Sequence, residues 1–240
     1  MTAWRRARRG GDRRPVSAAS QQVSQGASEL SIDDATELGV DRLAGFADCV
    51  FAFAMTLLVL SLTVPTASVR LLPALVRQWP QLLGYLMSFA FIGGLWMAHA
   101  HLTQLMKRAD TVAYGLSLLM LLFVAVLPFS TQLMVTHITG PDVEGAVLIY
   151  GINFLLASLM LSVLMIYVSE EPAMMIDNVA DAALKSIYRQ RWISIVVATI
   201  AVVVAIVAPL VAVALYIVET VLLLALPMLS VRRHRLRRAA

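Results

Sequence analysis

The chain has few charged residues and almost no cysteine. Only 14% of its 240 residues are Asp, Glu, Lys or Arg, whereas 60% are hydrophobic, and the mean hydropathy is +0.80. Soluble globular domains carry about 25% charged residues, so this composition excludes that class and indicates an integral membrane protein. The single cysteine, Cys49, excludes a disulfide within the chain.

The sequence also lacks the short motifs that mark common catalytic sites. It contains no HExxH pair, no Gly-x-Ser-x-Gly elbow, no Walker phosphate loop and no Cys/His cluster. A filter loop of the Thr-Val-Gly-Tyr-Gly type, which lines ordinary potassium channels with carbonyl groups, is missing as well. We therefore expect no enzymatic activity, no cofactor and no resident metal ion.

Long apolar runs predict membrane-spanning helices. A helix needs about 20 apolar residues to cross a hydrocarbon core of roughly 30 Å. Six segments fit this requirement: 46–65, 80–105, 112–135, 145–168, 192–209 and 211–231. The last two form one run of about 40 residues, twice the bilayer thickness as a single helix, so we divide it into a hairpin at Pro209. The runs lack the alternation of a membrane β-barrel, and the sequence predicts an all-α integral membrane fold with six spans.

Positive charge gathers on one side of this six-span arrangement. Clusters of Lys and Arg occupy residues 1–42, 106–111, 169–191 and 232–240. Basic loops remain in the cytoplasm, so the pattern predicts a multi-pass protein of the cell membrane with both termini cytoplasmic. We expect a disordered basic and polar tail over 1–38, a six-helix domain over 39–231 and a basic tail over 232–240. The tails lack the aromatic interleaving and folded scaffold of nucleic-acid binders, so membrane lipids are their expected partners.

Two charges lie at the beginning of the first apolar segment: Arg42 precedes it and Asp48 is within it. Six residues are about 1.7 helical turns, so the two side chains lie on different faces, and each is expected to find a partner elsewhere. A charge within a membrane segment costs at least about 2.5 kcal/mol and normally faces protein or water. Further along, bulky residues around one hydroxyl form a stripe at helical spacing, which is typical of a packing seam. The stripe contains Phe53, Thr56, Leu57 and Leu60.

The beginning of this segment resembles the first helix of the transmembrane protein 175 family, potassium-selective channels of endosomes, lysosomes and many prokaryotes. The family signature Arg-x-x-x-Phe-Ser-Asp corresponds here to Arg42, Phe46, Ala47 and Asp48, with alanine in place of serine. SFAFIGGLWMAHAHL is similar to the family's second helix, and LLFVAVLPFSTQLM and LIYGINF resemble its third and fourth helices. The similarity extends over about residues 40–230.

The resemblance implies an assembly and a function. In prokaryotic members, four six-helix subunits surround one pore lined by the first helix, which implies a homotetramer that conducts potassium passively. The implied pore residues are Phe53, Thr56, Leu57 and Leu60. Phe53 replaces the isoleucine or leucine that family members generally have there. The implied structural network contains Arg42, Phe46, Asp48, Trp96 and His99.

We expect a narrow apolar neck in which potassium is held only transiently. Hydrophobic constrictions can gate a pore by dewetting, and Leu57 and Leu60 are the expected gate. Four copies of Thr56 would offer hydroxyl oxygens to a partly dehydrated ion, with modest selectivity for potassium, which loses water more easily than sodium does.

Two acids within the spans leave an alternative function open. A proton-coupled secondary transporter would use Asp48 and Glu219 as its titrating groups, although inverted repeats are not obvious. For Glu219 we expect either a subunit contact or a position near the outer head groups. His99 and His101 lie about 200° apart on a helix and do not suit a common metal ion.

Overall fold

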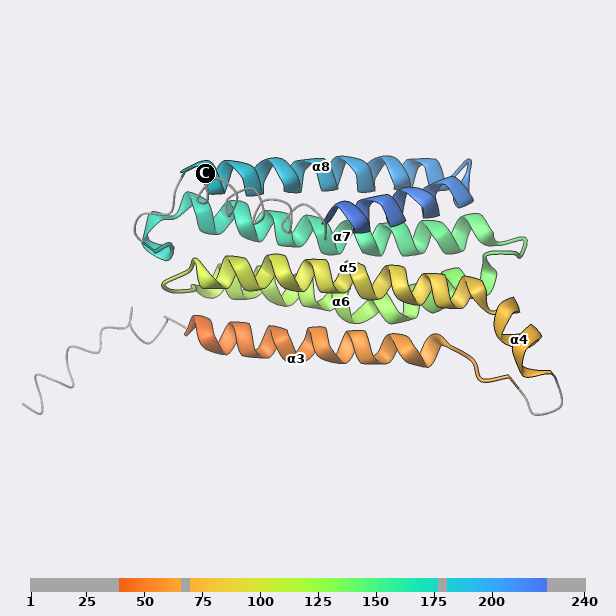
Figure 1. Cartoon of the computed structure of the whole chain (residues 1–240). Coiled ribbons are helices and arrows are strands. Elements are labelled where there is room, and N and C mark those ends of the chain that lie inside the picture. The colour runs from red at the N-terminus through yellow and green to blue at the C-terminus, as the bar shows by residue number, and fades with distance from the viewer. Residues whose placement is uncertain (1–38, 66–69, 177–180, 224–240) are drawn as a thin grey trace, which may run out of the picture. The chain divides into compact units, whose positions relative to one another are not determined.

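The structure, a computed structural model, describes residues 39–65, 70–176 and 181–223. The described residues are overwhelmingly helical, so the predicted all-α class is confirmed (Figure 1). The predicted tails, 1–38 and 232–240, lie outside the described residues, as does the end of the sixth predicted span. The elements are α3 (Val40–Leu58), η1 (Val59–Ser61), α4 (Leu71–Arg77), α5 (Trp79–Gln104), α6 (Thr111–His137), α7 (Val143–Glu170), η2 (Pro172–Met174), α8 (Asp181–Ala205) and the helix Pro209–Leu223.

Four helices are long and apolar enough to cross a membrane. They are Val40–Ser61, Trp79–Gln104, Thr111–His137 and Val143–Glu170, which correspond to the first four predicted spans. The apolar part of α8, Trp192–Ala205, and the helix Pro209–Leu223 are shorter. Leu223 is also the last residue that the structure describes. The count of six spans therefore stays a prediction.

The predicted hairpin at Pro209 is confirmed. Helix α8 ends at Ala205, and the amide of Ala208 donates to the carbonyl of Val204 at 2.7 Å as the chain turns. Pro209 is the first residue of the next helix, a position where its missing N–H costs no hydrogen bond and its fixed φ suits a helix.

Helix α3 begins earlier and ends earlier than predicted. It starts at Val40, because the charged side chains of Asp41 and Arg42 are exposed and need no burial in the bundle. The α-helix ends at Leu58, and the chain continues as the 3₁₀ turn η1 over Val59–Ser61. Leu60 therefore lies in the 3₁₀ turn η1 rather than in the α-helix.

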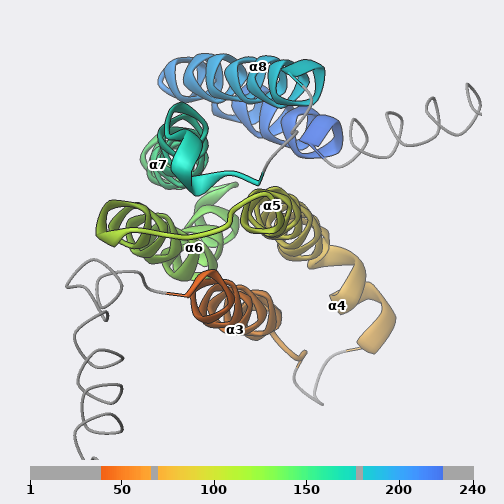
Figure 2. The same ribbon diagram turned by 90° about the vertical axis from the view of Figure 1, so that its left-hand side faces the viewer.

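Helices α5 and α6 separate α3 from α7 and α8. Helix α3 packs on α5 and α6, α6 packs on α7, and α7 packs on α8 (Figures 1 and 2). Buried hydroxyls join the central helices: Ser88 of α5 lies 2.8 Å from Thr131 of α6 and 3.2 Å from the hydroxyl of Tyr150 of α7. Lipid tails are as apolar as leucine side chains, so close packing and such hydrogen bonds, at about 0.6 kcal/mol each, hold membrane helices together.

The last described helix approaches α7 closely at a glycine. A Cβ atom added to Gly151 would lie only 1.9 Å from the hydroxyl oxygen of Tyr216, which is fully buried. Small residues allow such approaches in membrane bundles. Gly151 is therefore the contact that lets Pro209–Leu223 pack on α7.

Substitution of Gly151 by alanine should destabilise the bundle. The added methyl group overlaps the Tyr216 ring, and overpacking of this kind costs about 1–3 kcal/mol. Thermal unfolding in detergent, followed by size-exclusion chromatography, should show a lower midpoint for Gly151→Ala. Gly145→Ala on the same helix is the control, because nothing lies within 4 Å of its added Cβ. Equal midpoints for the two variants would contradict the packing described.

Candidate functional site

Helix α3 has two faces that differ in burial although both are mainly apolar. The buried residues recur every three or four positions, as one side of a helix does, and pack on α5 and α6. They are Leu43, Ala47, Phe51, Ala54 and Leu58. The opposite face is left uncovered by the rest of the described chain, with Phe53 and Leu60 each 71% exposed.

Six of the exposed residues of α3 and η1 follow a heptad spacing. Positions 42, 46, 49, 53, 56 and 60 are all exposed and are separated by four, three, four, three and four residues. We call Arg42, Phe46, Cys49, Phe53, Thr56 and Leu60 the α3 stripe. Such spacing places side chains along the seam where helices pack around a common axis. Three of the predicted pore residues belong to the stripe, and the fourth, Leu57, is exposed beside it.

The hydroxyl of Thr56 is oriented by its own helix. Its Oγ1 donates a hydrogen bond of 2.9 Å to the carbonyl oxygen of Phe53. Because the proton is directed at the backbone, the remaining lone pairs of Oγ1 face away from that carbonyl. An exposed hydroxyl held in this way can accept a hydrogen bond from water or contact a cation.

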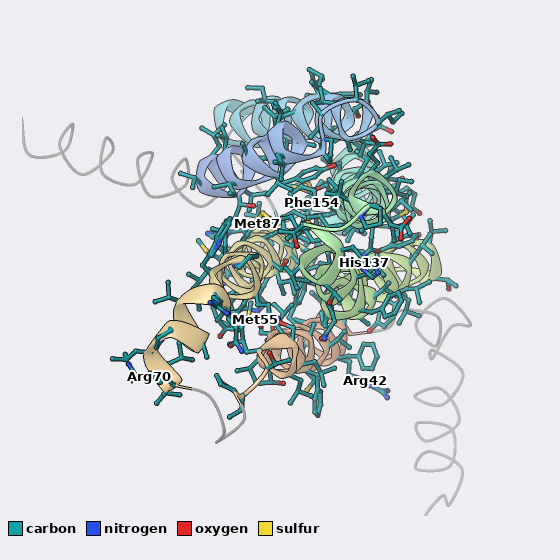
Figure 3. All side chains as sticks on the ribbon, turned by 90° about the vertical axis from the view of Figure 1, so that its right-hand side faces the viewer. Arg42, Met55, Arg70, Met87, His137 and Phe154 are labelled. Atoms are coloured by element: carbon teal, nitrogen blue, oxygen red, sulfur yellow. The ribbon has the colours of Figure 1, made fainter. Side chains whose placement is uncertain are left out.

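Asp48 joins α3 to α5. The indole N–H of Trp96 donates to its carboxylate oxygen Oδ1 at 2.7 Å. A hydrogen bond to an ionised acceptor is about twice as strong as one between neutral groups. Arg42, by contrast, is exposed and projects away from the helices (Figure 3). The two charges thus lie on different faces, and Asp48 has its partner on another helix.

His99 of α5 faces α3 and is 1% exposed. Its ring centroid is 6.0 Å from that of Phe51, and within the described part of the chain its Nε2 atom has no hydrogen-bond partner. Asp48, Trp96 and His99 therefore contribute to one packing interface of α3 with α5. The other two residues of the predicted network, Arg42 and Phe46, lie on the α3 stripe instead.

Hydrogen bonds fix the end of the bundle where α3 begins. The hydroxyl of Tyr114 donates to the carbonyl of Gly39 at 2.8 Å, which ties the start of α3 to α6. Asp110 caps α6 through the amide of Ala113 at 2.8 Å and accepts from Tyr167 of α7 at 2.5 Å. Sequence reasoning missed Tyr114 and Tyr167 because no motif marks them. It also missed Cys49, which the heptad spacing would have revealed.

The two acids of the predicted spans, Asp48 and Glu219, are in different environments. Glu219 is buried within the subunit and accepts a hydrogen bond of 2.6 Å from Ser194 of α8. Glu219 lies about three helical turns beyond Pro209, where the hairpin turns, and its position relative to the lipid head groups stays a prediction. Asp48 contacts α5 from α3, so the structure does not bring the two acids together.

The sequence of this chain is similar to those of known ion channels. Residues 42–128 match the sequence model of the family "Endosomal/lysosomal potassium channel TMEM175". A potassium channel of Chamaesiphon minutus is 36% identical over 118 residues, which are 48% of this chain and 58% of that protein. A potassium channel of Streptomyces collinus is 37% identical over 99 residues, 40% of this chain and 48% of that protein. The endosomal/lysosomal proton channel TMEM175 of Mus musculus is 36% identical over 113 residues, which are 43% of this chain and 23% of that protein.

A solved structure is similar over a longer range. The crystal structure of a lysosomal potassium-selective channel TMEM175 homolog from Chamaesiphon minutus superimposes with a TM-score of 0.70 at 25% identity, covering 78% of this chain and 96% of that one. The sequence matches themselves span about half the length of these bacterial relatives. The predicted resemblance to the transmembrane protein 175 family is confirmed.

Removal of the Trp96 indole N–H should loosen α3 from α5. Trp96→Phe keeps an aromatic ring but leaves the Asp48 carboxylate without this donor, and a hydrogen bond to a charged group contributes about 1.5–3 kcal/mol. Because Asp48 is exposed, the loss should lie at the lower end of this range. Thermal unfolding in detergent should show a lower midpoint than for Trp79→Phe, a control at an exposed site on the same helix. Equal midpoints would show that the bond does not stabilise the interface.

Proposed function

We propose that this chain is one subunit of a homotetrameric, passive potassium channel of the cell membrane, with a pore lined by α3. The observation that carries the proposal is the α3 stripe. A helix face that merely contacts lipid gains nothing from exposing a charged residue, a cysteine and a hydroxyl along one line. In a symmetric assembly, the heptad spacing brings four copies of the stripe to one axis.

The proposed orientation follows from charge. Lys107 and Arg108 lie in the α5–α6 loop, which is the end of the bundle where Tyr114 holds the start of α3. Basic loops remain in the cytoplasm, so this end is inside, and Leu60 is toward the outer end of the pore. Six spans with both termini cytoplasmic complete the proposed topology.

The proposed mechanism uses partial dehydration at an apolar neck. Phe53 and Leu60 are the most exposed apolar side chains of the stripe, and with Leu57 they form the constriction, which closes by dewetting. Between them, four copies of the Thr56 hydroxyl offer lone pairs to an ion that has lost part of its water. Potassium is dehydrated more easily than sodium, so the neck prefers it modestly.

Whether the channel conducts potassium ions or protons requires its own test, because its relatives are named for different ions. The bacterial relatives are named potassium channels, whereas the mouse relative is named a proton channel. Flux assays should therefore follow both ions. A proton-coupled transporter is the less favoured alternative, because Asp48 and Glu219 contact different helices.

The native cysteine provides a direct test of channel function. Cys49 is the only cysteine, is exposed, and lies on the α3 stripe one turn before Phe53. We expect liposomes that contain the protein to release potassium down its gradient, and a cationic methanethiosulfonate reagent to reduce this flux severalfold by placing a positive group in the pore. Cys49→Ala should conduct and resist the reagent. Unchanged flux after mass spectrometry has shown that Cys49 is modified would contradict a pore at this face, and so would a cysteine that the reagent never reaches.

Thr56 should contribute to selectivity. Thr56→Ala removes the hydroxyl lone pairs from the neck, so the reversal potential under opposed potassium and sodium gradients should move toward that of a non-selective pore. Thr56→Ser keeps the hydroxyl and should retain selectivity. Recordings from planar bilayers would check both variants. If Thr56→Ala kept the reversal potential of the original protein, the hydroxyl would have no role in selecting the ion.

A further inference from the structure

Helix α4 is a short helix that the rest of the described chain leaves almost uncovered. It spans Leu71–Arg77 between α3 and α5, and none of its residues is buried. It lies at the end of the bundle opposite to the start of α3, where α5 begins (Figure 1). In a chain that spans the membrane, this end is at the level of the lipid head groups.

The apolar side chains of α4 point away from the protein. Leu72 and Val76 are 76% and 72% exposed, and Leu71 and Leu75 are exposed beside them. Ala74, on another side of the helix, is partly covered. At about 100° per residue, the four exposed side chains fill one arc of the helix that does not face α5.

Two arginines lie on the side of α4 away from this apolar face. Arg70 precedes the helix and Arg77 ends it, and because seven residues are about two turns, both lie on the same edge, opposite to Leu72 and Val76. Both are exposed, and Arg70 projects outward from α4 (Figure 3). From Leu43 to Met106 the sequence has only three charged residues, and two of them are these arginines. Trp79, exposed just after α4, is of a type enriched at membrane–water interfaces.

We propose that α4 is an interfacial anchor that lies along the surface of the outer leaflet and binds anionic phospholipids. A helix with an apolar face and two arginines on its other side fits the boundary between acyl chains and head groups, and guanidinium groups bind phosphate oxygens. Leu71, Leu72, Leu75 and Val76 enter the acyl region, while Arg70 and Arg77 remain at the phosphate level.

The anchor is connected to the outer end of α3. Thr63, three residues after Leu60, accepts a hydrogen bond of 3.1 Å from Nε2 of Gln78, the residue that joins α4 to α5. Thr63 also donates to Gln81 Oε1 at 3.2 Å. Lipid bound at α4 therefore acts on the segment that holds the end of α3.

Site-directed spin labelling in lipid vesicles tests the placement of α4. On the Cys49→Ala background, nitroxides at Leu72→Cys and Val76→Cys should collide with dissolved oxygen far more than with a water-soluble nickel chelate, as lipid-facing groups do. Ala74→Cys, on the side toward the protein, should show less contact with oxygen. Strong collision with nickel would place the apolar face in water. Protection from both reagents with dipolar broadening would place it against another copy of the chain, and either result would overturn the proposal.

The role of the arginines is tested by lipid charge. Adding phosphatidylglycerol to phosphatidylcholine vesicles should raise the oxygen-to-nickel collision ratio at Leu72→Cys, because anionic head groups draw α4 to the surface. The pair Arg70→Gln and Arg77→Gln should abolish this rise, whereas Arg108→Gln at the opposite end should leave it intact. A ratio that does not respond to phosphatidylglycerol, or a rise that survives removal of both arginines, would overturn the anionic-lipid assignment. Neither measurement depends on conduction, so the result is independent of the proposed channel activity.

Discussion

The packing of α3 on α5 and α6 is the interaction on which the rest of the structure depends. This contact buries one face of a helix that is apolar on both sides, and it thereby decides which face stays uncovered. The Trp96–Asp48 hydrogen bond and the contact of Phe51 with His99 fix the rotation of the helix about its axis. Because rotation by about half a turn would exchange the exposed and buried faces, the α3 stripe stays uncovered only while these contacts hold.

The remaining helices provide a rigid support for that contact. An apolar side chain is in an equally apolar environment against lipid tails or against another helix. The helices are therefore held together by close packing and hydrogen bonds. The hydroxyls of Ser88, Thr131 and Tyr150 join α5, α6 and α7, and Gly151 lets the last described helix reach α7. Tyr114 holds the first residues of α3 at one end of the bundle. Helix α3 is thus held along its length by helices that leave its stripe free.

Much of this arrangement could be predicted from the sequence, because the membrane allows few solutions. Apolar run length located the first four spans, and Pro209 located the hairpin. Hydropathy alone does not predict where α3 begins and ends. Exposed charged side chains such as Arg42 can lie on a helix that extends beyond its apolar segment. The burial of Glu219 within the subunit was not predicted either. Its buried position depends on Ser194, a partner 25 residues away in the chain that only the antiparallel hairpin brings near.

The family resemblance indicated which residues to consider for the candidate site, but not which of them lie together in the structure. Family resemblance implied a network of Arg42, Phe46, Asp48, Trp96 and His99, and the structure divides these residues between a packed interface and the α3 stripe. The division follows from helical phase: Arg42 and Phe46 are in register with Phe53, whereas Asp48 is not. Sequence reasoning considered the spacing only from Phe53 onward and so overlooked that the stripe begins at Arg42 and includes Cys49.

The central claim is that identical copies of α3 converge on one axis with the stripe toward it. A cryo-electron microscopy reconstruction of the purified protein in lipid nanodiscs tests this most directly. The account predicts a fourfold axis with Phe53, Thr56 and Leu60 of every subunit facing it. A reconstruction in which α3 turns these side chains toward lipid, away from any symmetry axis, would contradict it.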